Sequence, residues 1–257
     1  MLHHFCMTKR IQYYKSFEQD FAASKRQNYC LPDDYDYRGG WTRRIGAWLL
    51  YPLILLIDLV YMKLVAGVKV ENRRVLRGVK GGYFLYANHT QLFGDVVNPF
   101  LITRWRRPYI VCSAANLGIA VLGPLLPTAG ALPIPEDLRG MRRFSQAVEA
   151  CVRKHPVVVY PEGHLWPWCT EIRPLAAASF HYPAKYEKPV FVATTTYRKS
   201  RWRKKPRAII YLDGPFEPDA TLGRKVRQAE LARKVAATMQ QRAKLSDFVY
   251  VEYRPKR

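Results

Sequence analysis

A histidine and an aspartate lie close together in NHTQLFGD, the segment from Asn88 to Asp95. This segment follows the apolar run YFLYA, which is typical of a buried strand. A neutral imidazole such as His89 accepts a proton, and a nearby carboxylate such as Asp95 holds one tautomer and stabilises the imidazolium. The pair could therefore form a general base with its orienting group. The same residues are also typical of a capped turn that leads into a helix.

A second polar turn, YPEGHLWP, runs from Tyr160 to Pro167 after another apolar stretch. Parallel strands present their carboxyl ends at one edge of a sheet, so Glu162 and Gly163 are expected to face His89 across a cleft. A glycine in a turn lets a ligand approach the backbone, and a Glu162 carboxylate accepts hydrogen bonds from hydroxyl groups. Pro-Glu-Gly is equally a common turn without catalytic meaning.

The elements that must position these turns begin near Gly81, where β-rich runs alternate with helical segments. The expected strands cover residues 83–89, 107–114, 155–163, 188–197 and 207–214. Apolar residues at helical spacing predict one helix around 138–151 and a last amphipathic helix from about 224 to 244. This alternation predicts an α/β fold with a mostly parallel central sheet covered by helices.

An apolar stretch, IGAWLLYPLILLIDLVYMKLVAGVKV, begins at Ile45, and only Ile45 to Ile57 is free of charge. That length is short of the roughly 20 apolar residues of a spanning helix, and Pro52 predicts a kink. Basic residues flank both ends, which favours both ends lying on one side of a membrane. We expect an N-terminal hydrophobic helical segment that docks in the membrane plane, and a buried helix of a soluble core is the alternative.

The amino-acid composition limits the kinds of molecule that this protein is expected to bind. The chain has 257 residues, with 42 Lys and Arg against 20 Asp and Glu, giving a formal net charge of +22. Such a balance favours an anionic partner, such as nucleic acid, an anionic membrane surface or phosphate-bearing coenzyme A. The five cysteines lack the spacing of a zinc site or a disulfide framework, and we expect them to be reduced.

Three regions are expected along the chain. Residues 1–40 mix aromatic and charged residues without a clear period and predict an irregular or partly helical lead-in. Residues 41–68 form the expected membrane-docking motif, and residues 69–257 form the catalytic-sized domain. The N-terminus lacks the continuous apolar run of a secretory signal, so a membrane-associated protein on the cytoplasmic face is expected.

Taken in order, NHTQLFGD, GALPIPED (130–137), YPEGHLWP and KPVFVATTTY (188–197) resemble the four blocks of the glycerolipid acyltransferases. This is the family of the 1-acylglycerol-3-phosphate acyltransferases. The resemblance extends over about residues 68–214, and the apolar stretch before it resembles the family's membrane-docking two-helix motif. It implies transfer of a fatty acyl group from acyl-CoA or acyl-carrier protein to a lysophospholipid such as lysophosphatidic acid, in phospholipid biosynthesis.

The resemblance also assigns roles to residues. Asn88-His89 and Asp95 match the catalytic block, and Glu162 and Gly163 match the Glu-Gly of the acceptor-binding block. His164 and Leu165 stand where the family usually has Thr and then a basic residue. Asn88 and His164 are nevertheless candidates to bind substrate. Five residues separate His89 from Asp95, where the family usually has four.

The second block has an acidic pair, Glu136 and Asp137, where the family commonly has an arginine that holds the acceptor phosphate. Arg139 and Arg173 are candidates to replace it. No metal or cofactor is implied, because the thioester is a co-substrate.

Two alternatives remain open. A dense basic run, YRKSRWRKKPR (197–207), could dock on an anionic surface, could be only a solvated loop, or could bind single-stranded nucleic acid. The chain could therefore be a basic nucleic-acid-binding α/β protein, although nucleic acid is not the partner we expect. An acyltransferase that acts on a lipid acceptor without phosphate is the other alternative.

Overall fold

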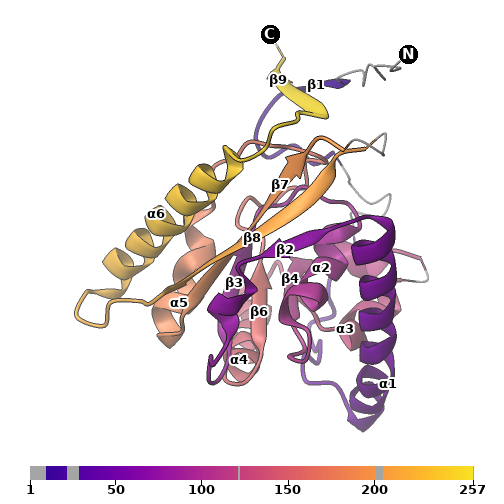
Figure 1. Ribbon diagram of the computed structural model, residues 1–257. Coiled ribbons are helices and arrows are strands. Elements are labelled where there is room, and N and C mark those ends of the chain that lie inside the picture. Colours follow the sequence, from indigo (N-terminus) through magenta and orange to yellow (C-terminus); the bar gives the residue numbers. More distant parts are fainter. Residues whose placement is uncertain (1–9, 22–28, 121, 201–204, 257) are drawn as a thin grey trace, which may run out of the picture.

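The computed structural model of the protein describes residues 10–21, 29–120, 122–200 and 205–256. Its centre is a seven-stranded sheet in the order β2-β8-β7-β3-β6-β4-β5 (Figure 1). All neighbouring strands pair in parallel except β7 and β8, which are antiparallel. The prediction of a mostly parallel α/β sheet is therefore confirmed. The strands are β2 (Lys69–Glu71), β3 (Tyr83–Ala87), β4 (Tyr109–Ser113), β5 (Ala131–Ile134), β6 (Pro156–Val159), β7 (Val190–Arg198) and β8 (Arg207–Phe216).

Helices cover both faces of this sheet because successive strand residues point to opposite sides. In β3, Leu85 contributes to the core under α2, whereas Phe84 and Tyr86 contribute to the core under α4, α5 and α6. The helices are α2 (Gly94–Thr103), α3 (Leu126–Ala129), α4 (Leu138–Val152), α5 (His181–Tyr186) and α6 (Arg224–Ala243). Short helical turns are η2 (Arg73–Leu76), η3 (Ala114–Gly118), η4 (Gly123–Leu125) and η5 (Ala177–Phe180). The predicted helices around 138–151 and 224–244 are confirmed.

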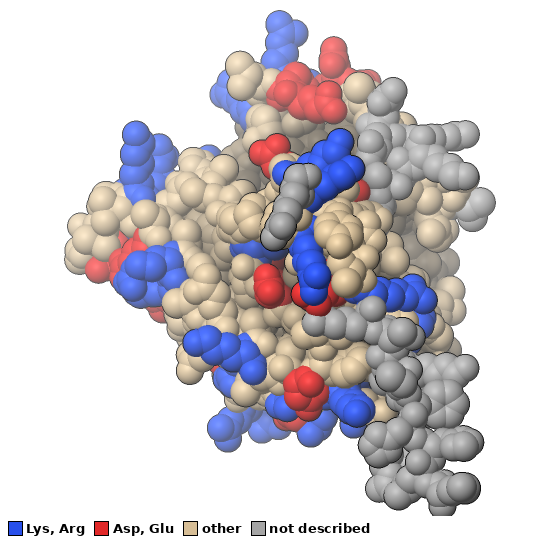
Figure 2. Space-filling view, turned by 90° about the horizontal axis from the view of Figure 1, so that it is seen from above, with Lys and Arg blue, Asp and Glu red and all other residues tan. Residues whose placement is uncertain are grey.

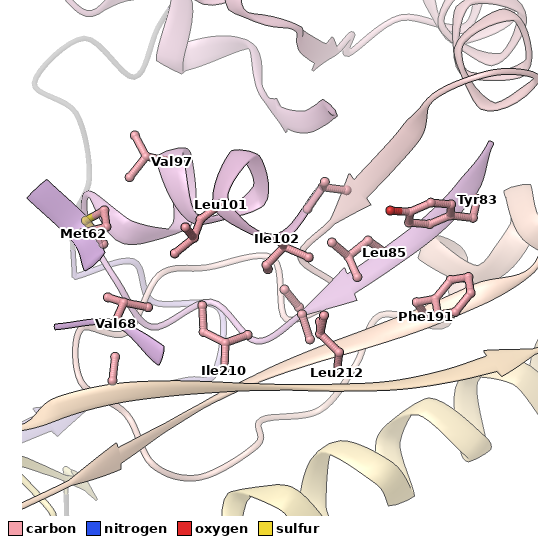
Figure 3. Close-up of a cluster of buried hydrophobic side chains, with 14 of the residues drawn as sticks. Met62, Val68, Tyr83, Leu85, Val97, Leu101, Ile102, Phe191, Ile210 and Leu212 are labelled. Atoms are coloured by element: carbon pink, nitrogen blue, oxygen red, sulfur yellow. The ribbon is translucent and has the colours of Figure 1, made fainter. Parts of the chain in front are cut away.

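On the α2 side of the sheet, one hydrophobic core extends from the apolar stretch after Ile45 to the strands. Met62, Leu101 and Ile102 approach the sheet from the helical side, and Leu85 and Ile210 meet them from the strands (Figure 3). These side chains are almost completely buried. Removing them from water holds α2 against the carboxyl half of the sheet, next to the segment that carries His89.

The apolar stretch forms one continuous helix, α1 (Trp41–Ile57) followed by a π-helical part, η1 (Asp58–Val65). A two-helix motif was expected, but the helix passes through Pro52 and past Asp58, whose N–H bonds back to Ile54 and Leu55. Trp41–Val65 is long and apolar enough to cross a membrane. The helix packs on α2 and α3 along one side, and much of its apolar surface is exposed, including Trp48 (76 %) and Leu64 (68 %).

The lead-in was expected to be irregular or partly helical, and its described residues are irregular apart from one strand that was not predicted. Residues Arg10–Tyr14 form strand β1, which pairs in parallel with β9 (Val251–Pro255) near the other end of the chain. The two strands lie together at the top of Figure 1. Because β1 and β9 lie far apart in sequence, no local pattern of residues indicates that they pair.

Candidate active site

His89 and Asp95 come together despite the extra residue between them. His89 Nδ1 lies 2.8 Å from Asp95 Oδ2, which also accepts the backbone N–H groups of Thr90 and Gln91, each at 2.8 Å. Because a carboxylate oxygen only accepts, the Nδ1 atom that faces it carries the proton, and Nε2 keeps its lone pair. The His89 side chain is 23 % exposed. This geometry provides an oriented general base that an incoming hydroxyl group can reach.

The lengthened turn between the two residues is held by side-chain amides. Asn98 Nδ2 donates to Gln91 Oε1 at 2.6 Å, and this amide oxygen lies directly beside Gly94. A Cβ atom at position 94 would lie 1.9 Å from Gln91 Oε1, so any larger residue would displace the Gln91 amide. A larger residue at position 94 would therefore disturb the contact between Gln91 and Asn98.

Glu162 and Arg173 form a buried ion pair behind the His89 segment. Arg173 donates to Glu162 Oε2 at 2.7 Å, and both side chains are almost completely buried. Glu162 also accepts the N–H of His89 at 2.9 Å and the N–H of Arg173 at 3.0 Å. Burial raises the pKa of Glu162, and the Arg173 guanidinium opposes that rise. Both Glu162 oxygens are thus engaged by the protein, so this carboxylate supports the His89 turn and does not receive a substrate hydroxyl.

Arg173 was a candidate to hold an acceptor phosphate, and the structure buries its side chain, with Nη2 bonded within the protein and Nε and Nη1 without a hydrogen-bond partner among the described residues. Besides Glu162, its guanidinium donates to the carbonyl groups of His89 and His164 and lies over the Trp166 ring, 4.8 Å from the ring centroid. The second candidate, Arg139, is exposed in the first turn of α4. Asp137, in the same block, caps that helix through the Gly140 N–H.

Asn88 ties β3 to its neighbour in the sheet. Its Nδ2 donates to the Thr195 carbonyl at 3.0 Å, and its Oδ1 accepts the Thr195 N–H at 2.7 Å. The residue is 2 % exposed. Asn88 was expected to bind substrate, but its amide continues the pairing of β3 with β7 and fixes where the chain turns towards His89.

Gly163 and His164 lie on the outer side of the second turn. Gly163 is exposed and has a φ of +77°, a conformation that favours glycine. No heavy atom lies within 4 Å of a Cβ built at this position. His164 is half-buried, and its backbone N–H bonds to the Glu162 carbonyl. The backbone at this turn is therefore open to an approaching molecule.

Tyr160 and Trp166 complete the surroundings of His89, and sequence analysis did not single out either residue. The Tyr160 ring stacks on the His89 ring with centroids 4.5 Å apart. The backbone N–H of Trp166 donates to the His89 carbonyl at 3.2 Å, and the backbone N–H of Trp168 donates to the Thr90 carbonyl at 2.8 Å. Their place beside Pro-Glu-Gly was the available signal, but aromatic residues there are equally typical of packing.

Trp166 also joins the site to both ends of the described chain. Its ring contacts Tyr14, Phe17 and Phe21 of the lead-in and stacks on Tyr253 of β9 at 4.6 Å. Its Nε1 donates to the Gln19 carbonyl at 2.7 Å. The lead-in is therefore part of the support of the His89 turn.

The side of the site that faces the helix of α1 and η1 is apolar. Leu92, Phe93 and Val96 are exposed beside the His89 turn. The Phe93 ring meets the ring of Tyr61, in η1, edge to face with centroids 5.9 Å apart. The helix formed by α1 and η1 and the His89 turn thus share one exposed apolar rim.

The basic run at 197–207 is described only in part. Trp202 and its basic neighbours at 201–204 lie outside the described residues, and the flanking parts of the run belong to β7 and β8. Across the described ranges, no group of three or more His, Cys, Asp or Glu residues could hold a metal ion.

Comparison with known proteins supports the fold through structure and not through sequence. No protein-family model matches this sequence, and no curated protein does. Among solved structures, the chain is similar to the 1-acyl-sn-glycerophosphate (LPA) acyltransferase PlsC from Thermotoga maritima. The TM-score is 0.56 at 13 % sequence identity, and the match covers 81 % of this chain and 86 % of the other. The protein thus has a PlsC-like α/β fold with a mostly parallel central sheet.

Proposed function

We propose that this protein is a membrane-associated acyltransferase that moves a fatty acyl group from a thioester donor to a hydroxyl group of a lysophospholipid. Lysophosphatidic acid is the first acceptor to test, and the donor is acyl-CoA or acyl-carrier protein. The observation that carries the proposal is the His89 Nδ1 to Asp95 Oδ2 contact of 2.8 Å, at the strand ends of a PlsC-like sheet. It leaves the other ring nitrogen available as a base.

The reaction that fits this geometry is direct transfer. His89 Nε2 takes the proton of the acceptor hydroxyl while its oxygen attacks the thioester carbonyl carbon. The tetrahedral intermediate then expels the thiolate, which receives the proton from the imidazolium, so the products are an ester and a free thiol. Asp95 keeps the ring oriented and stabilises its charged form.

An acceptor without a phosphate group is the second candidate, and the burial of Arg173 favours it. The Arg173 side chain is only 3 % exposed, and its Nη2 atom donates to Glu162 and to backbone carbonyl groups. A phosphate needs a free basic group near the attacking hydroxyl. Comparing lysophosphatidic acid with monoacylglycerol as acceptors separates the two candidates.

Association with the cytoplasmic face of a membrane is part of the proposal. The exposed apolar side of α1 and η1 meets the apolar rim at Phe93, next to the His89 turn. A lipid acceptor held in a bilayer could thus reach the base without crossing water. The excess of positive charge favours an anionic leaflet.

Nucleic-acid binding has weaker support. Figure 2 shows Lys and Arg side chains spread over the face seen from above, with acidic side chains among them, and not gathered into one basic stripe. A nucleic-acid site usually gathers its charge along one face or groove. Salt-sensitive retention on single-stranded nucleic acid, without binding to anionic vesicles, would support this alternative.

The deciding experiment measures thiol release from palmitoyl-CoA by the purified protein in mixed micelles, with and without lysophosphatidic acid. We expect release that depends on the acceptor and is lost in His89→Ala, while the melting temperature of the variant stays close to that of wild type. Release without acceptor would indicate a thioesterase. An active, folded His89→Ala protein would contradict the proposed mechanism.

A further inference from the structure

A proline in α2 changes the hydrogen bonding of the catalytic aspartate's own backbone. In an α-helix, the N–H of residue 99 would donate to the carbonyl of residue 95. Pro99 lies inside α2 and has no N–H, so the Asp95 carbonyl lacks its helical donor. Asp95 is 5 % exposed, which makes an unpartnered carbonyl here costly.

Tyr160 supplies the missing donor from a different element. Its hydroxyl group donates to the Asp95 carbonyl at 2.5 Å, from the turn that directly follows β6. Burial raises the pKa of Tyr160 well above its ordinary value, and Asp95 adds to this effect, so the hydroxyl stays protonated and able to donate. The bond fixes the start of α2 relative to the strand ends.

The same Tyr160 side chain also contacts the general base. Its ring stacks on the His89 ring at a centroid distance of 4.5 Å and an interplanar angle of 25°. One rigid residue thus holds the imidazole by its face and the backbone of the carboxylate partner by its hydroxyl group. Both members of the pair are located relative to one side chain.

We propose that Tyr160 is a positioning residue that sets the distance between His89 and Asp95, and that Pro99 makes this possible by freeing the Asp95 carbonyl. The inference rests on the proposed acyl transfer. It assigns to Tyr160 no contact with substrate, and it predicts that the loss of its hydroxyl group can be compensated by an N–H at residue 99.

The test is a double-mutant cycle of Tyr160→Phe and Pro99→Ala, with kcat, KM and melting temperature measured for each protein. Tyr160→Phe keeps the ring stack but leaves the Asp95 carbonyl unpartnered, so kcat should fall about tenfold with little change in KM. Pro99→Ala alone is the reference for the double variant, because it gives the Asp95 carbonyl a helical N–H while Tyr160 keeps its hydroxyl group. The double variant should recover most of the lost kcat, because an alanine at position 99 restores the helical N–H.

Tyr86→Phe is the matched control. The Tyr86 hydroxyl donates to the Ser179 carbonyl at 2.7 Å, and its side chain belongs to the core on the opposite face of the sheet. This variant should lose melting temperature but keep kcat. If Tyr160→Phe behaves like Tyr86→Phe, or if the double variant is as slow as Tyr160→Phe, the positioning role is wrong.

The outcomes separate this inference from the acyltransferase proposal. An inactive wild-type protein would count against the proposed function, and the melting temperatures would still decide whether Tyr160 and residue 99 satisfy the same carbonyl. If Tyr160→Phe fails to fold, a folded double variant supports the shared carbonyl. A double variant that also fails to fold overturns it.

Discussion

His89 can act as a base through Nε2 because its other ring nitrogen, Nδ1, already contacts Asp95. The Asp95 carboxylate oxygen that contacts Nδ1 is itself held by two backbone N–H groups of the same turn. The ring therefore has one orientation and one tautomer, which is what general-base catalysis requires. At the residue scale, reactivity here follows from which hydrogen-bonding groups are occupied and which are left free.

Asp95→Asn is expected to lower kcat by roughly 10²- to 10⁴-fold. The asparagine amide has almost the same shape, but its one acceptor oxygen cannot serve the two backbone N–H groups and the ring as a carboxylate does. The measurement is acceptor-dependent thiol release, with circular dichroism to check folding. A folded variant with wild-type kcat would remove Asp95 from the mechanism.

Arg173→Met should destabilise the protein by about 3–5 kcal/mol, because it leaves the Glu162 carboxylate buried without its partner. Denaturant unfolding measures this change. Arg139→Met is the control, since Arg139 is exposed, and it should leave stability unchanged. If Arg173→Met instead raises only the KM for lysophosphatidic acid, or if Arg139→Met does, the affected arginine contacts the acceptor after all.

At the element scale, the continuous helix of α1 and η1 has two chemically different sides. Asp58 and Met62 are buried where η1 packs against the body, whereas Trp48, Leu53 and Leu64 are exposed. The exposed apolar side is what a membrane-docking element requires. The buried side contains a carboxyl group whose oxygen atoms have no side-chain or backbone donor of normal hydrogen-bond geometry.

Asp58→Asn should stabilise the protein at high pH and not at low pH. Burial raises the pKa of Asp58 from 3.8 to about 7, so the folded protein keeps a proton that the unfolded chain releases. Wild-type stability is therefore lost as the pH rises from about 4 to about 7, by at most roughly 4 kcal/mol. Melting temperatures at about pH 4 and about pH 8 should show a gain for the variant only at the higher pH.

Asp34→Asn, at an exposed position, is the control for removing one negative charge. An Asp58→Asn variant with the same change in melting temperature at both pH values would show that ionisation of Asp58 does not limit stability.

Replacing Trp48 and Leu64 with Glu should weaken binding to anionic vesicles more than tenfold, since each buried large apolar side chain contributes about 1.5–3 kcal/mol. Both side chains are exposed, so the fold should be kept. Cosedimentation with vesicles measures the effect. Val226→Glu, an exposed position on α6, is the matched control, and equal losses in both proteins would mean that α1 and η1 do not dock.

At the scale of the whole molecule, the two ends of the described chain meet beside the candidate active site. Strand β1 pairs with β9, and residues of both strands pack on the Trp166 ring. The backbone N–H of Trp166 donates to the His89 carbonyl. The described part of the lead-in therefore belongs to the same architecture as the candidate active site. Support for the site extends well beyond the four motif blocks.

Deletion of residues 1–40 should therefore lower the melting temperature and reduce kcat, because β9 loses its partner and Trp166 loses its aromatic cover. Deletion of residues 1–9, which leaves β1 in place, is the control and should change neither value. Thermal unfolding and the thiol-release assay measure both. If the longer deletion is as stable and active as wild type, the lead-in does not support the site.

Much of the fold could be predicted because its signals are local. The aromatic run of β3, the Val- and Ile-containing runs of β6, β7 and β8, and the helical spacing of α4 and α6 are readable from neighbouring residues. The edge strands β2 and β5 and the strand pair β1 and β9 were not predicted. These strands contain charged residues or a proline, in RIQYY, KVE, ALPI and VEYRP, and so lack the continuous apolar run that marks the central strands.

The sequence by itself determined the types and order of the reactive groups: a histidine followed by an aspartate after one strand, and a Glu-Gly turn after another. Only the tertiary structure decided what each group can do. It placed Asp95 against His89 and engaged Glu162 and Arg173 with each other. It also put Tyr160 between the base and the backbone of its partner. The physical reason is that a side chain's chemistry depends on its hydrogen-bond partners and burial, and those come from segments far apart in the chain.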